Sequence, residues 1–113
     1  MPGSQLVTSW QSGGTDSMWD RATWQINESP VTVRAYMEQY LPPAEERSPG
    51  RWYSGLCDES ALARWVSNQI NGDRYPWYTE DNVPLPCVSV VVKTEPNAAG
   101  LTEYDIWAEW PAP

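Results

Sequence analysis

The chain contains no His and no Phe, and it has only one Lys and two Cys among 113 residues. Without His, it lacks the usual general base near neutral pH and the commonest ligand of transition metals. Ser–His and Cys–His catalysis within this chain is therefore excluded. The remaining acid–base groups are carboxylates such as the adjacent Glu45 and Glu46, whose side chains point in different directions and are expected in solvent. This inventory favours a protein that is not an enzyme and that holds no metal and no cofactor.

The two cysteines, Cys57 and Cys87, are too few and too widely spaced for a zinc site. In a cytoplasmic protein such a pair is more often two reduced, packed thiols than a disulfide. We therefore expect two structural cysteines in the reduced state.

Basic residues are also scarce, because seven Lys and Arg stand against fifteen Asp and Glu, for a formal net charge of −8. This charge repels nucleic acid and anionic membrane, so we expect no direct nucleic-acid binding. No stretch approaches the roughly 20 apolar residues of a membrane-spanning helix, and the first residues lack the pattern of a signal peptide. We expect a cytoplasmic protein. The scarcity of Lys, Phe and Ile beside plentiful Pro, Gly, Ala, Arg and Trp indicates a GC-rich genome, that of a bacterium or its phage.

Trp and Tyr are abundant, with eight and six copies. Every large ring in the chain therefore carries an N–H or an O–H group. Such rings concentrate where one edge is buried and the other is wet, as at interfaces and ligand platforms. The aromatic composition indicates a binding protein.

The length allows a single domain, 1–113, in which we expect residues 1–4 to be disordered and 73–86 to form a long aromatic loop. Alternating apolar residues, helical stripes and turn residues predict the other elements. The order favours an α+β domain, a mainly antiparallel sheet of about four strands with two helices on one face. The segment 42–56 is expected to be an exposed connection with a short extended piece at 51–53. The predicted strands are 5–10, 18–26, 87–94 and 101–110, and the predicted helices are 30–41 and 58–71.

Residues 12–17 read Ser-Gly-Gly-Thr-Asp-Ser. This segment resembles the SGGxDS loop of the ATP pyrophosphatase family, in which a strand leads into a Gly-rich loop whose N–H groups hold phosphates. The resemblance covers these six residues only. The alternative is a flexible hairpin loop, since Gly-Gly beside Ser, Thr and Asp is ordinary turn chemistry. The resemblance implies a nucleotide site formed by Ser12, Gly13, Gly14, Asp16 and Ser17.

The last predicted strand carries an acidic face, Glu103, Asp105 and Glu109, around Trp107. Side chains two residues apart on a strand lie roughly 6.5–7 Å apart, similar to successive phosphates, so this face is a candidate mimic of a nucleic-acid backbone. Alternatively, the charges only discourage edge-to-edge aggregation. Trp107 favours an interface, because a large ring among carboxylates has no obvious role in solubility.

A third candidate is the aromatic loop that contains Tyr75, Trp77 and Tyr78, either alone or joined by Trp52 and Tyr53. Exposed rings of this kind stack on sugars or form the centre of a protein interface. The alternative is a loop folded back as a lid on the core.

The leading hypothesis is a small, acidic, non-catalytic protein-interaction module whose partner is a protein with a basic surface. A more specific hypothesis is an inhibitor, encoded by a phage or mobile element, of a basic nucleic-acid-handling protein. The alternatives are an ATP pyrophosphatase-like nucleotide-binding enzyme and a carbohydrate-binding module. The predicted partner-binding residues are Glu103, Asp105, Trp107, Glu109, Tyr75, Trp77 and Tyr78.

Overall fold

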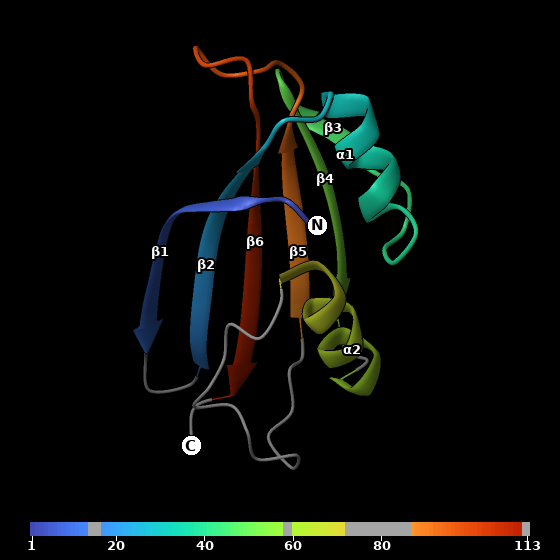
Figure 1. The fold of residues 1–113 in the computed structure, drawn as a ribbon. Helices are drawn as coiled ribbons and strands as arrows, with labels where there is room; N and C mark the ends of the chain where they lie inside the picture. The colour runs from blue at the N-terminus through green and yellow to red at the C-terminus, as the bar shows by residue number, and fades with distance from the viewer. Residues whose placement is uncertain (14–16, 58–59, 72–86, 112–113) are drawn as a thin grey trace.

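The computed structural model describes residues 1–13, 17–57, 60–71 and 87–111 (Figure 1). Six strands form one antiparallel sheet in the order β1-β2-β6-β5-β4-β3. Two helices accompany it. The elements are β1 (Gln5–Gly13), β2 (Ser17–Ile26), α1 (Pro30–Met37), β3 (Glu45–Ser48), β4 (Arg51–Cys57), α2 (Ser60–Asn71), β5 (Cys87–Lys93) and β6 (Thr102–Pro111).

The predicted α+β class, the antiparallel sheet and the two helices are confirmed, but the estimate of about four strands is too low. The additional strands are β3 and β4, which form a hairpin in the segment expected to be mainly an exposed connection. The short extended piece expected at 51–53 is the start of β4, which continues to Cys57 and pairs with β5 along its whole length. Its sequence mixes aromatic and small polar residues, so the alternation that marks a strand is weak.

One face of the sheet carries the core. Burial alternates along β5, where Val88, Val90 and Val92 are buried and the residues between them are partly exposed. Such alternation is expected when only one side of an antiparallel sheet is covered. Both helices pack against this side and contact β5 (Figure 1). The core cluster consists of Ile26, Val33, Met37, Leu41, Ala63, Val66, Ile70, Val88, Val90, Val92, Tyr104 and Ile106.

The helix α1 begins as the sequence predicts, because the Ser29 side chain accepts a hydrogen bond from the N–H of Thr32 and Pro30 occupies the first turn. It ends at Met37 rather than at residue 41. The carbonyl of Met37 accepts bonds from the N–H groups of both Tyr40 and Leu41, which closes the helix in a tight turn. Leu41 is nevertheless buried in the core, as its place in the predicted apolar stripe requires.

The helix α2 buries one side against the sheet. Ala63, Val66 and Ile70 are buried, whereas Trp65 is 52% exposed. The ring of Trp65 instead lies 5.7 Å from that of Tyr40 at the surface. The small side chain of Ala63 lets the helix approach the sheet, whereas Trp65 lies on the outer side of the helix.

The first residues, which we expected to be disordered, lie against the core. The Met1 amino group donates to the carbonyl of Ile70 and to the hydroxyl of Tyr104, each at 3.4 Å. The hydroxyls of Ser4 and Tyr104 are 2.5 Å apart. Burial raises the pKa of Tyr104 to about 12. The segment thus satisfies the polar end of a ring that is otherwise enclosed in the core.

The two cysteines form a disulfide rather than the expected pair of reduced thiols. Cys57 and Cys87 stand directly opposite one another on β4 and β5. The sequence could not indicate this pairing, because a strand extending to Cys57 was not predicted. Disulfides persist mainly in oxidising compartments, so the pair weighs against the expected cytoplasmic location. Among the described residues, no helix is long and apolar enough to cross a membrane.

Candidate binding face

The side of the sheet opposite the two helices is called the open face here. Strand register places its residues in rows that run across β2, β6, β5 and β4. Because alternate residues of a strand point to opposite sides, this face is fixed by the same register as the core. Its residues are Trp10, Trp19, Arg21, Thr23, Gln25, Arg51, Tyr53, Gly55, Ser89, Val91, Lys93, Glu103, Asp105, Trp107 and Glu109.

Three tryptophans on the open face form a continuous arrangement that we call the Trp ladder, consisting of Trp10, Trp19 and Trp107. The ring of Trp10 meets that of Trp19 edge to face, with centroids 4.4 Å apart. Trp19 stacks on Trp107 with centroids 4.7 Å apart and an interplanar angle of 13°. Trp10 is 53% exposed at the outer end. The Trp10 ring is thus held by Trp19, which is itself supported by Trp107, and this lowers the entropy that Trp10 loses when a partner buries it.

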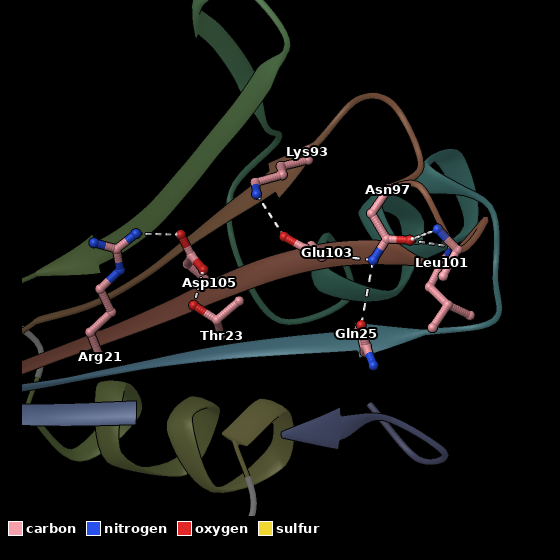
Figure 2. A network of polar contacts seen from close by, with 9 residues as sticks. Arg21, Thr23, Gln25, Lys93, Asn97, Leu101, Glu103 and Asp105 are labelled. Atoms are coloured by element: carbon pink, nitrogen blue, oxygen red, sulfur yellow. Dashed lines mark hydrogen bonds and ion pairs between the residues drawn. The ribbon is translucent and has the colours of Figure 1, made fainter. Parts of the chain in front are cut away.

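The carboxylate of Asp105 is neutralised by its neighbours on β2. Arg21 Nη2 donates to Asp105 Oδ2 at 2.8 Å, and the Thr23 hydroxyl donates to Oδ1 at 2.6 Å (Figure 2). The Arg21 guanidinium also lies 6.0 Å from the centroid of the Trp107 ring. Asp105 therefore anchors Arg21 beside the Trp ladder.

The carboxylate of Glu103 is held by a second polar group on the same face (Figure 2). Lys93 Nζ donates to Glu103 Oε2 at 2.6 Å, and Asn97 Nδ2 donates to Oε1 at 3.2 Å. These bonds, the first above all, hold the pKa of Glu103 below its ordinary value. Asn97 also accepts hydrogen bonds from the N–H groups of Ala99 and Leu101, each at 3.0 Å, which orders the turn between β5 and β6.

A groove of about 800 Å³ lies on the open face above β5. Its floor is made of small side chains, because Ser89 and Val91 project from β5 and Gly55 stands opposite Ser89 on β4. A Cβ at Gly55 would come within 3.2 Å of Ser89 Cβ, so the two strands approach closely here. The groove is lined by Arg21, Thr23, Arg47, Arg51, Tyr53, Ser54, Gly55, Cys57, Ser89, Val91, Lys93, Asp105 and Trp107.

The groove is cationic although the chain is acidic. Four of the seven basic residues line it, and among the described residues of the lining Asp105 is the only carboxylate. Arg21 and Lys93 have carboxylate partners, but Arg47 and Arg51 have none among the described residues. Arg51 stands directly opposite Lys93 across the ladder between β4 and β5. Like charges in that arrangement repel and destabilise the pair.

Four predicted partner-binding residues, Glu103, Asp105, Trp107 and Glu109, do share one face of β6. Glu103 and Asp105 are engaged in ion pairs, whereas Glu109 has no ion-pair partner among the described residues. The other three predicted partner-binding residues, Tyr75, Trp77 and Tyr78, lie outside the described residues.

The segment that resembles a phosphate-binding loop connects two antiparallel strands. Ser12 and Gly13 end β1, and Ser17 begins β2. Gly14 and Asp16 lie outside the described residues. The element after the loop is a strand, so no helix N-terminus follows it to help hold a phosphate.

Sequence reasoning missed Trp10, Trp19 and the four cations as site residues, whereas Tyr53 was considered only as a ring that joins the aromatic loop. A signal for part of this set was present, because the alternation in β2 already placed Trp19 and Arg21 on the side away from the core. Arg47 and Arg51 carried no comparable signal, since the hairpin that presents them was not predicted.

The described residues contain no group of three or more His, Cys, Asp or Glu side chains placed to hold a metal ion. Comparisons of the chain with models of protein families, with curated proteins and with solved structures gave no match.

Proposed function

We propose that this protein is a non-catalytic protein-interaction module that docks its partner on the open face, with the Trp ladder as anchor. The observation that carries the proposal is the half-exposed ring of Trp10, held edge to face by Trp19, which itself stacks on Trp107. Tryptophans in a preorganised setting are the residues most enriched at the energetic centres of protein interfaces.

The strand that bears Trp10 supports the same surface. β1 is an outer strand of the sheet and contains no charged residue. Val7 on this strand, at the register shift between Leu6 and Thr8, is 49% exposed. The opposite outer strand, β3, is four residues long and begins Glu45-Glu46, which discourages pairing with another chain. A partner that covers Trp10 therefore also meets an uncharged outer strand.

The more specific hypothesis of a nucleic-acid mimic that engages a basic partner draws less support from the geometry. Arg21 and Lys93 neutralise Asp105 and Glu103, so these carboxylates do not form a free anionic row. Glu109 is the remaining carboxylate of the predicted acidic face. The proposed interface therefore consists of the rings of the Trp ladder rather than the carboxylates of β6.

The proposal is tested by replacing one exposed Trp on each side of the sheet. Trp10→Ala removes the outer ring of the Trp ladder, whereas Trp65→Ala removes an equally exposed ring from the helix side. Each variant and the parent are used as bait in bacterial lysate treated with nuclease, and the retained proteins are quantified by mass spectrometry. Affinity for the purified partner is then measured by calorimetry.

We expect Trp10→Ala to weaken binding at least tenfold, as for a tryptophan at the centre of an interface, and Trp65→Ala to leave it unchanged. Equal retention by all three baits would contradict the proposal, as would equal loss in both variants. Circular dichroism of each variant checks that the fold is retained.

A further inference from the structure

We infer that the groove above β5 is a binding site for a compact organic anion, a planar ring that bears a phosphate group, of the size of a mononucleotide. The groove reaches from β2 to β3 across the open face and includes Trp107, but it does not include Trp10 at the exposed end of the Trp ladder. The inference does not depend on the proposed protein interaction.

Positive charge is concentrated at one end of the groove. Arg47, Arg51 and Lys93 come from three adjacent strands and all line it. Lys93 has Glu103 as a partner, but Arg47 and Arg51 have no carboxylate partner among the described residues. Arg51 stands directly opposite Lys93, so the two positive charges repel each other. A bound anion would relieve this repulsion. Arg side chains bind phosphate oxygens with two parallel N–H donors, which suits this end to a phosphate.

The shape of the groove suits a planar ring. Its flanking strands β4 and β6 are separated by β5, and therefore by roughly 10 Å. Between them the floor residues Ser89 and Val91 are small, while Tyr53 and Trp107 line the groove from the two flanking strands. The Tyr53 ring is fixed by a 3.0 Å hydrogen bond between its hydroxyl and that of Ser48. A planar ring fits such a space between aromatic side chains.

The distance between the cationic end and the small floor of the groove limits the length of the ligand. The cationic end at Arg51 and the small floor at Gly55 are four residues apart along β4, or roughly 13 Å. This distance suits one ring with one short anionic arm. Outer strand β3 bears Glu45 directly opposite Tyr53, on the same side of the sheet. This carboxylate and the net charge of −8 oppose the further phosphates of a nucleic-acid strand.

The test is a titration of the protein with AMP, adenosine, inorganic phosphate and a single-stranded oligonucleotide. Binding is followed by calorimetry and by NMR of the backbone amides and the tryptophan indole N–H groups. We expect AMP to bind at least tenfold more tightly than adenosine or inorganic phosphate alone. The signals of Trp107, Gly55 and Ser89 should shift, while the indole of Trp65 on the helix side stays unchanged.

Three variants locate the site. Arg51→Gln should weaken AMP binding about tenfold, because hydrogen bonds to charged groups are the stronger ones. Ser89→Leu should weaken it at least as much without any change of charge, by filling the floor. Arg34→Gln removes the same charge from the helix side, where Arg34 faces Glu38 and Trp52, and should change the affinity less than twofold.

The inference is overturned if none of the four probes binds, if adenosine binds as well as AMP, or if Arg34→Gln and Arg51→Gln weaken binding equally. Tighter binding of the oligonucleotide than of AMP would overturn it in favour of a nucleic-acid site. The outcome is separable from that of the proposed protein interaction, because Trp10→Ala should retain AMP binding and Arg51→Gln should retain the partner.

Discussion

Trp19 on β2 stacks on Trp107 on β6, with ring centroids 4.7 Å apart and planes only 13° from parallel. The two residues are not directly opposite, because Trp19 pairs with Glu109 and Trp107 with Arg21. The rings therefore meet on the diagonal between rows. Long aromatic side chains reach across this diagonal, and here they connect the exposed Trp10 to the middle of the sheet.

The stack should contribute to stability as well as to the interface. Aromatic pairs in this geometry are worth about 1 kcal/mol beyond the area they bury. We therefore expect a double-mutant cycle of Trp19→Ala and Trp107→Ala, measured by urea unfolding, to give a coupling energy of about 1 kcal/mol. The same cycle between Trp19 and the distant Trp65 is the control and should give a coupling close to zero. Additive losses at Trp19 and Trp107 would show that the stack is not energetically coupled.

The carboxylates on the predicted acidic face of β6 should differ in how much they contribute to the free energy of unfolding. Asp105→Asn keeps the shape of the side chain but removes the charge that Arg21 and Thr23 contact, and it should cost about 1 kcal/mol of unfolding free energy. Glu109→Gln should change it by less than about 0.5 kcal/mol, as for a surface substitution without an ion-pair partner. Urea unfolding of both variants at neutral pH and at two salt concentrations measures the difference.

The same pair of variants bears on the nature of the partner. If the partner presents a basic surface, Glu109→Gln should weaken its binding and reduce the salt dependence, since Glu109 is the least compensated of these carboxylates. If the rings carry the interface, the affinity should be unaffected by Glu109→Gln and lost in Trp10→Ala.

Glu103 should stabilise the fold near neutral pH, and this contribution should be lost in acid. Its pKa is below the ordinary value of 4.5 in the folded state, first because Lys93 donates to it and then because Asn97 does. A carboxyl group of this kind stabilises the fold above pH 4.5, and that contribution disappears as the pH falls through the lower folded pKa. Lys93→Met should raise the pKa of Glu103 and flatten the acid branch of the stability profile. NMR titration of the Glu103 carboxyl carbon, with urea unfolding from neutral to acid pH, measures both effects.

Asn97 supplies a graded control for this prediction. Asn97→Asp keeps the oxygen that accepts from Ala99 and Leu101 but removes the donor to Glu103 and adds a negative charge beside it. The pKa of Glu103 should then rise, although the turn is kept. An unchanged Glu103 titration in both Lys93→Met and Asn97→Asp would contradict the assigned cause of the shift.

The strands of the central sheet could be predicted because one side of them is buried. Val88, Val90 and Val92 alternate with Ser89, Val91 and Lys93, and Tyr104, Ile106 and Ala108 alternate with Asp105, Trp107 and Glu109 on β6. The outer hairpin could not be predicted in the same way. β3 reads Glu-Glu-Arg-Ser, without an apolar residue, and all but its last residue are exposed. Its strand character comes from pairing with β4, a long-range contact that leaves no local periodicity.

The candidate site was predictable only in part for the same reason. The face of β6 that bears Trp107 followed from alternation within one strand. The Trp ladder and the groove depend on which strands are neighbours, and β2 pairs with β6 although the two are far apart in the chain. The pairing of β2 with β6 brings Arg21 beside Asp105, so that Arg21 neutralises its charge. Charge patterning along the sequence therefore suggested an acidic surface where the register creates ion pairs.

The disulfide should be a main source of stability for the β4–β5 part of the sheet. Cys57 and Cys87 are 30 residues apart in sequence and enclose α2. A crosslink over a loop of that length stabilises a fold by about 3 to 4 kcal/mol in the chain-entropy description. We expect reductant to lower the unfolding free energy of the parent by about this amount, and the double variant Cys57→Ala, Cys87→Ala to show the same loss.

Urea unfolding with and without reductant provides the measurement, and mass spectrometry after alkylation counts the free thiols in each sample. The double variant is the control, because reductant should not affect its stability. Since Cys57 also lines the groove, AMP affinity should fall when the disulfide is reduced, whereas binding at Trp10 on the far strand should persist. An unfolding curve that does not move while both thiols are free would show that the pairing of β4 with β5 alone holds this part of the sheet.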